Sequence, residues 1–132
     1  MKRCLVGGLI VGVLMCGGHQ AFAHHSFAAT YLENQTVTIE GELVQFVLRN
    51  PHSFVYVDVK QADGTAVRYL VEWASPTQLQ GKINRDTLQT GDHVVISGSP
   101  GRNEADHRVR MLTFKRPKDG WSWGLLPDEQ FK

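Results

Sequence analysis

The chain has 132 residues, with 14 Lys and Arg against 13 Asp and Glu, a formal net charge of +1 and 42% hydrophobic residues. This near-neutral balance gives no electrostatic reason to bind nucleic acid or an anionic membrane surface, and the length suits one domain with one core. Both cysteines, Cys4 and Cys16, lie near the N-terminus, so the rest of the chain offers no disulfide, thiolate zinc site or cysteine nucleophile.

The first 23 residues have the pattern of a cleavable signal peptide. Lys2-Arg3 precedes an apolar stretch over residues 5–15, which is too short and too rich in glycine to span a bilayer comfortably. Ala21-Phe22-Ala23 then gives a small-x-small cleavage site. We expect export to the periplasm, cleavage after Ala23 and no stable membrane insertion afterwards, in preference to a retained anchor or a lipoprotein made at Cys16.

Removing 23 residues from 132 leaves a mature chain of 109, with 12 basic and 13 acidic side chains and a charge of −1. Residues 24–35 are polar and weakly patterned, which predicts an N-terminal arm. Alternating residues predict a strand over 36–40 that is interrupted at Gly41 and resumes over 43–48. A glycine inside a long strand often marks a bulge or bend that lets a sheet curl.

The clearest hairpin signal is Asp63-Gly64 between predicted strands over 53–60 and 66–73. Ser75-Pro76 then predicts a short helix that ends near Gly81, because serine is a good N-cap and proline suits the first helical position. This places a helix between the third and fourth strands.

Two more strands are predicted over residues 93–98 and 109–115, with an exposed loop over Ser99–Glu104 between them. The domain should therefore cover residues 36–116, followed by a C-terminal tail over 117–132 that either packs on the barrel or remains loose. Five short strands with a helix after the third predict an all-β, OB-like barrel, and a small β-sandwich would show nearly the same pattern.

Common catalytic signatures are absent from the sequence, including the G-x-S-x-G elbow, the H-E-x-x-H helix, the Walker loop and the dinucleotide fingerprint. Its carboxylates are scattered, with no pair that suggests acid–base chemistry. An enzyme is not favoured, although a redox-active copper with an open coordination position would permit one.

The histidines are the candidate metal ligands. Cleavage after Ala23 makes His24 the first residue, where its α-amino group and imidazole can chelate one ion. A further imidazole from His25 or from His52 would complete a nitrogen-rich site, a histidine brace, which suits Cu(II) better than Ca²⁺ or Mg²⁺. Cleavage after Phe22 would instead present Ala23-His24-His25, which binds Cu(II) through the amine, two amides and the imidazole of His25.

Three residues are further candidates for ligand binding, each with a simpler structural interpretation. Asn50 could orient a ligand beside His52, Glu72 could line a pocket, and Arg102 could hold an anion. A turn residue, a solvated strand-end carboxylate and an exposed loop arginine are the alternatives. His93 is expected to be structural and His107 to be solvated.

Several blocks together resemble an uncharacterised family of small exported bacterial proteins. The blocks are His24-His25-Ser26-Phe27-Ala28-Ala29, Gly41 to Phe46, Asn50-Pro51-His52, Glu72 to Pro76, Gly91 to Val94 and Gly98 to Arg102. Leu48-Arg49 departs from the pattern, because family members often carry a Trp and a small polar residue there. The resemblance implies export and a shared domain of unknown function, and it implies no activity.

Two hypotheses follow from the sequence. The first is a periplasmic copper-binding protein with His24, His25 and His52 as ligands and a role in storage, delivery or sensing. The second is a non-metal module that binds a ligand or a periplasmic protein partner through its strands and the loop around Arg102.

Overall fold

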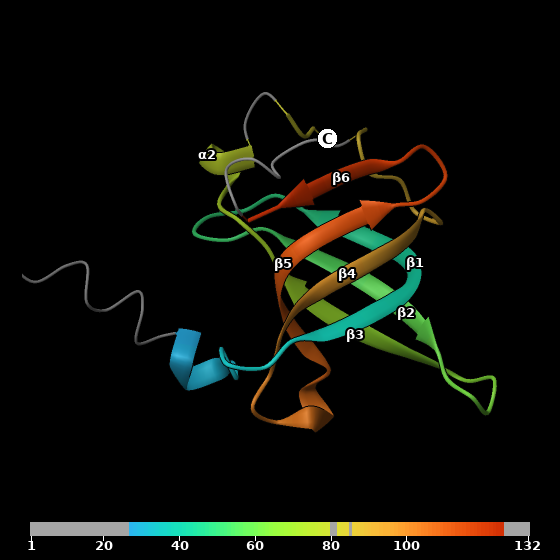
Figure 1. Ribbon diagram of the computed structural model, residues 1–132. Helices are drawn as coiled ribbons and strands as arrows, with labels where there is room; N and C mark the ends of the chain where they lie inside the picture. The colour runs from blue at the N-terminus through green and yellow to red at the C-terminus, as the bar shows by residue number, and fades with distance from the viewer. Residues whose placement is uncertain (1–26, 80–81, 85, 126–132) are drawn as a thin grey trace, which may run out of the picture.

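The structure is a computed structural model that describes residues 27–79, 82–84 and 86–125 (Figure 1). It contains the strands β1 (Val37–Val47), β2 (Phe54–Lys60), β3 (Ala66–Glu72), β4 (His93–Pro100), β5 (Arg108–Arg116) and β6 (Trp121–Gly124). The helical elements are α2 (Pro76–Leu79), as expected between the third and fourth strands, and the 3-10 helix η1 (Glu104–Asp106). Within these residues, no helix is both long and apolar enough to cross a membrane.

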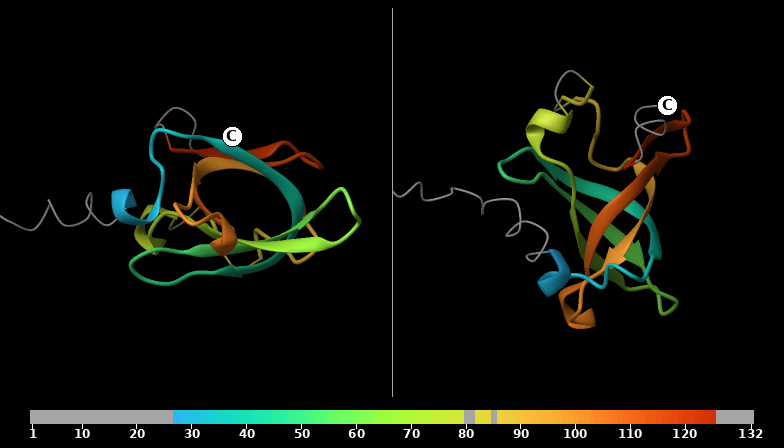
Figure 2. Two further views of the ribbon diagram at one scale, coloured as in Figure 1. Left: turned by 90° about the horizontal axis from the view of Figure 1, so that it is seen from below. Right: turned by 60° about the vertical axis from the view of Figure 1, so that its left-hand side comes forward.

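The first five strands close into a barrel. The strand order is β3-β2-β1-β4-β5-β6, and β3 also pairs with β5 in parallel, which joins the two sides. The left view of Figure 2 shows the strands enclosing a ring, with β6 outside it. The prediction of an all-β, OB-like barrel is confirmed, and the sandwich alternative is not what the strands form.

The interior is filled by the apolar residues that alternate along each strand. Seven of these side chains are completely buried: Val55, Val57, Val71, Val94, Ile96, Val109 and Phe114. Burying one such side chain contributes about 1.5–3 kcal/mol relative to leaving it in water, so this alternation is the main force that closes the barrel.

β1 is one continuous strand, and the predicted interruption at Gly41 is wrong. The register irregularity lies between Leu43 and Gln45 instead. Gly41 is needed for a different reason, since an added Cβ there would lie 2.2 Å from the backbone oxygen of Asp58. Glycine therefore marks a close approach of two backbones at the point where β1 passes from β4 to β2.

The predicted loop over Ser99–Glu104 is partly wrong. Ser99 and Pro100 belong to β4, and Ser99 is buried beneath its neighbours. Gly101 continues the pairing through an isolated bridge to Tyr31. Only the residues from Arg102 onward form the exposed connection, which η1 then shapes into a compact turn.

The beginning of the expected C-terminal tail is part of the sheet. β6 pairs antiparallel with the end of β5, with Trp123 opposite Phe114. Trp123 is buried and meets the ring of Trp73 edge-on at 5.4 Å, while Trp73 stacks on Phe114 at 5.7 Å. These three rings belong to the buried hydrophobic core.

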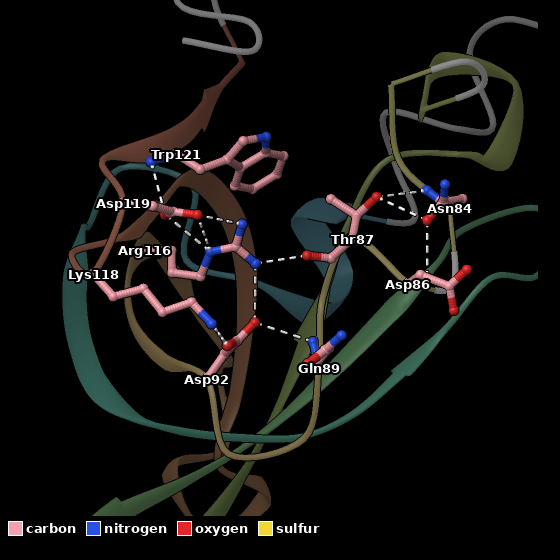
Figure 3. Close-up of polar contacts among 9 residues, drawn as sticks. All are labelled: Asn84, Asp86, Thr87, Gln89, Asp92, Arg116, Lys118, Asp119 and Trp121. Atoms are coloured by element: carbon pink, nitrogen blue, oxygen red, sulfur yellow. Dashed lines mark hydrogen bonds and ion pairs between the residues drawn. The ribbon is translucent and has the colours of Figure 1, made fainter.

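An ion-pair network around the buried side chains of Asp92 and Arg116 fixes the connection between α2 and β4 (Figure 3). Arg116 Nη1 donates to Asp92 Oδ2 at 3.0 Å and to the Thr87 carbonyl at 2.6 Å. Its Nη2 donates to Asp119 Oδ2 at 2.8 Å, and Lys118 Nζ donates to the second oxygen of Asp92. The guanidinium therefore joins the end of β5 to the residues that lead into β4.

Candidate functional site

Four segments of the chain meet around the carboxylate of Glu72, the last residue of β3. The register between β2 and β3 pairs Phe54 with Glu72, which brings the preceding connection and His52 to the same place. The parallel register of β3 and β5 pairs Leu70 with Arg108 and so brings the start of β5 alongside. Tyr31 arrives from the N-terminal segment through its bridge to Gly101.

The carboxylate of Glu72 is engaged at both oxygens. His52 Nδ1 lies 2.6 Å from Oε1, and the Tyr31 hydroxyl donates to Oε2 at 2.5 Å. Arg108 Nη2 lies 3.6 Å from the same Oε2. The Glu72 side chain is 12% exposed, so these partners replace much of the water that a free carboxylate would bind.

Tyr31 is completely buried beside this carboxylate. Burial, together with the hydrogen bond to Glu72, raises the pKa of Tyr31 well above its ordinary value. The phenol therefore keeps its proton at neutral pH and acts as a hydrogen-bond donor to Glu72.

The N-terminal segment is held against the barrel by two aromatic contacts. Residues 27–30 form a helical turn, and Phe27 packs on the His52 ring with a centroid separation of 5.1 Å. Arg110 Cζ lies 3.9 Å from the centroid of Phe27, and its Nη1 donates to Glu33 at 2.6 Å. Phe27, the first described residue, therefore lies directly beside His52.

Arg102 belongs to the same region. Its Nε donates to the carbonyl of Ala28 at 2.7 Å, and its backbone N–H donates to the carbonyl of Thr30 at 2.9 Å. In this structure the predicted anion-binding arginine is thus engaged with the backbone of the N-terminal segment.

Besides Arg102, the predicted site residues are His52, Glu72, Asn50, His24 and His25. His52 and Glu72 are brought into direct contact, and Asn50 is an exposed residue of the same connection, joined to Pro51 by a cis peptide bond. His24 and His25 lie outside the described residues.

The two remaining described histidines lie apart from this cluster. His93 begins β4 and pairs through Nε2 with Glu40 at 2.8 Å, at an exposed position. His107 is half-buried, adopts a left-handed backbone conformation with φ 45° and packs on Tyr69 at 5.3 Å. The expectation that His107 is simply solvated is therefore wrong.

In the described part of the chain, no group of three or more His, Cys, Asp or Glu side chains is placed to hold a metal ion. His52 with Glu72 makes a pair, to which any further nitrogen ligand would have to be added from elsewhere.

A cavity of about 470 Å³ opens near η1, and Arg108 of the Glu72 cluster is among its lining residues. Its apolar wall includes Val37, Ile39 and Tyr69, and its polar rim includes Asn103 and His107. The volume and the mixed lining are within the range of small-molecule pockets.

Sequence reasoning missed Tyr31 and Arg108 as members of the cluster. Tyr31 lies within the weakly patterned segment 24–35, and its partner Glu72 lies 41 positions away. A long-range bond of this kind leaves no periodic signal in the sequence, although an isolated aromatic residue in a polar arm is itself a sign of docking.

The comparisons with known proteins agree with the resemblance noted in the sequence. Residues 12–110 match a family of unknown function, DUF6152, and the chain belongs to that family. The match includes His52, Glu72 and Arg108. A search of curated proteins finds no match.

Proposed function

We propose that the mature protein is a periplasmic Cu(II)-binding protein whose ligands are His24, His25 and His52. Its role would be storage, delivery or sensing of copper, with a periplasmic protein as the partner for transfer. The proposal requires proteolysis after Ala23, since only a freed α-amino group can chelate together with the imidazole of residue 24.

The observation that carries this proposal is the packing of Phe27 on His52 at 5.1 Å. His24 precedes Phe27 by three residues, and three residues span at most about 11 Å of fully extended chain. Covalent connection alone therefore keeps the first mature residue near His52. A histidine free at a distant terminus would have no such restriction.

The hydrogen bonding of His52 supports the same proposal. Because Nδ1 faces a carboxylate, it is the protonated nitrogen of the neutral imidazole, and Nε2 retains its lone pair. A ligating histidine commonly donates its other ring N–H to a carboxylate, which orients the ring and makes it a stronger base. Glu72 occupies that position.

The expected ligand set explains the preference for copper. An amine and two or three imidazoles provide nitrogen donors in a planar or T-shaped arrangement, which suits Cu(II). Calcium and magnesium bind oxygen ligands instead. Cleavage after Phe22 would also produce a Cu(II) site, through the amine, two amides and His25, but that site would not require His52.

The test is a Cu(II) titration of protein purified from the periplasm, with mass spectrometry to identify its first residue. We expect tight binding by protein that starts at His24. Three extra N-terminal residues, which leave no histidine at the third position, or His52→Ala, should weaken binding at least about 100-fold, the upper limit for loss of an outer-shell partner alone. The EPR spectrum should also change, because each form removes one nitrogen donor from the site. His93→Ala is the matched control and should leave binding unchanged.

Two results would contradict this proposal. One is an attached leader in the exported protein, and the other is equal, weak binding by the natural, extended and His52→Ala forms. The second result would favour a non-metal ligand-binding module, for which the cavity beside η1 is the specific supporting feature. Chemical-shift changes at Tyr69 and His107 on addition of small molecules would then locate that activity.

A further inference from the structure

Glu72 makes more side-chain contacts than a solvated carboxylate at a strand end requires. It faces an imidazole, a phenol and a guanidinium that come from three different segments. We infer that Glu72 is a positioning residue: it fixes the proton of His52 on Nδ1, and Tyr31 and Arg108 hold its carboxylate in place for that task. The inference rests on the proposed function in one respect. If the protein binds copper, the purpose of this arrangement is to keep Nε2 of His52 available to the metal.

The first step is the direction of the hydrogen bond. A carboxylate can only accept, so the 2.6 Å contact with Nδ1 requires the proton to be on that nitrogen. In water, a free neutral imidazole exchanges its proton between both nitrogens. A fixed acceptor at one side of the ring selects one tautomer and leaves the lone pair at Nε2.

The second step is that the acceptor is itself fixed. The Tyr31 hydroxyl donates to Oε2, and its ring is completely buried, so the donor has little freedom to turn away. Arg108 adds a cation 3.6 Å from the same oxygen, and its Cζ also lies 5.7 Å from the centroid of the Tyr31 ring. The carboxylate is thereby oriented by contacts on the side opposite His52.

The third step is a comparison within the molecule. His93 also contacts a carboxylate, Glu40 Oε1, at 2.8 Å, but the side chains are 50% and 63% exposed. That pair uses Nε2 rather than Nδ1. An exposed pair exchanges readily with water and should not hold one tautomer. The two histidines can therefore be compared within one protein: the tautomer of His52 should be fixed, and that of His93 should be free to exchange.

The experiment is ¹⁵N NMR of the histidine rings in metal-free processed protein, at a pH where both imidazoles are neutral. We expect His52 to be the Nδ1–H tautomer and His93 to be a mixture. Glu72→Ala, which removes the acceptor, should convert His52 to a mixture and weaken Cu(II) binding by about tenfold or more, within the range for loss of an outer-shell carboxylate. Tyr31→Phe should do the same to a smaller extent.

The matched control is Glu40→Ala, which should change only the signals of His93. If Glu72→Ala does not fold, Tyr31→Phe tests the same chain of contacts with a smaller change in shape. An Nε2–H tautomer at His52, or a tautomer that is unchanged in both variants, would overturn the inference. Because the tautomer is measured without copper, a fixed Nδ1–H form in a protein that binds no copper would reject the proposed function alone.

Discussion

Asp92 shows how one residue can fix an irregular connection. It is buried and faces both Arg116 and Lys118 (Figure 3). Burial opposes ionisation of its carboxyl, yet hydrogen bonds from Lys118 and the Gln89 amide hold the pKa of Asp92 below its usual value. The folded state therefore favours the charged form of Asp92, which links stability to pH.

We predict that Asp92→Asn lowers the free energy of unfolding at neutral pH by about 2 kcal/mol. This is less than the 3–5 kcal/mol typical of a broken buried pair, because Asp119 and the Thr87 carbonyl still contact Arg116. Chemical denaturation measures the change. The exposed Asp86→Asn is the control, and an equal loss in both variants would contradict a special role for Asp92.

We also predict that Asp92→Asn changes how the free energy of unfolding depends on pH. Since the pKa of Asp92 is lower in the folded than in the unfolded state, its contribution is complete above the ordinary value of 3.8 and is lost as the pH falls through the folded pKa. Natural protein should therefore lose stability more steeply than Asp92→Asn as the pH falls below that value. Parallel slopes in denaturation series would show that Asp92 is not the group responsible.

At the scale of the element, β1 is the strand that joins the two halves of the barrel. It pairs with β4 as far as Glu42 and with β2 from Glu42 onward. At Gly41 its backbone approaches that of Asp58 so closely that a Cβ would lie 2.2 Å from a carbonyl oxygen. Because that neighbour is backbone rather than a flexible side chain, the strands would have to separate to admit a methyl group.

We predict that Gly41→Ala lowers the free energy of unfolding by about 2–3 kcal/mol, in the upper part of the range for overpacked sites. Glu42→Ala, at the next and exposed position, should change it by less than about 0.5 kcal/mol. Denaturant midpoints of the two variants give the comparison. A fully stable Gly41→Ala protein would show that the backbones can move apart at little cost.

At the scale of the whole molecule, a group of aromatic rings around Trp73 ties β6 to the hydrophobic core. The rings of Phe46, Phe114 and Trp123 surround that of Trp73, at centroid separations of 5.4–5.7 Å. Trp121 meets Phe114 edge-on at 5.4 Å. β6 therefore contributes to closing the core although it lies outside the barrel itself.

We predict that Trp123→Ala costs about 3–5 kcal/mol, as expected for removal of a buried aromatic side chain. Leu125→Ala is the control, since Leu125 is 44% exposed and follows β6 directly. Denaturation followed by far-ultraviolet circular dichroism is suitable, because the substitution itself alters tryptophan fluorescence. Similar midpoints for both variants would mean that β6 adds little to the core.

Much of the barrel could be predicted because its strands alternate cleanly. Val55 and Val57 stand two positions apart in β2, Val71 belongs to the alternating pattern of β3, and all three are fully buried. β6 was missed, although Asp119-Gly120 between Arg116 and Trp121 is a hairpin signal of the same kind as Asp63-Gly64. Both tryptophans lie in the segment predicted as a tail, and the strand that they form is only four residues long.

The candidate site was only half visible in the sequence. His52 and Glu72 could be named from their positions at strand ends, but nothing in the local pattern joins them. Their contact depends on the pairing of Phe54 with Glu72, and the contact with Tyr31 depends on the bridge to Gly101. Register and long-range bridges are properties of the closed sheet, and periodicity along one strand does not encode them.

Closure of the barrel through β3 and β5 has a consequence for the order of assembly. β2 and β3 are joined by a tight turn and can meet early, whereas Leu70 must find Arg108 and Val37 must find Gly98 across long stretches of chain. Loop-closure entropy delays such pairings, and topologies rich in them fold in milliseconds to seconds. The contact of His52 with Glu72 needs only the hairpin, whereas Arg108 needs the closing pair of β3 and β5, so we expect the Glu72 cluster to be completed only after the barrel closes.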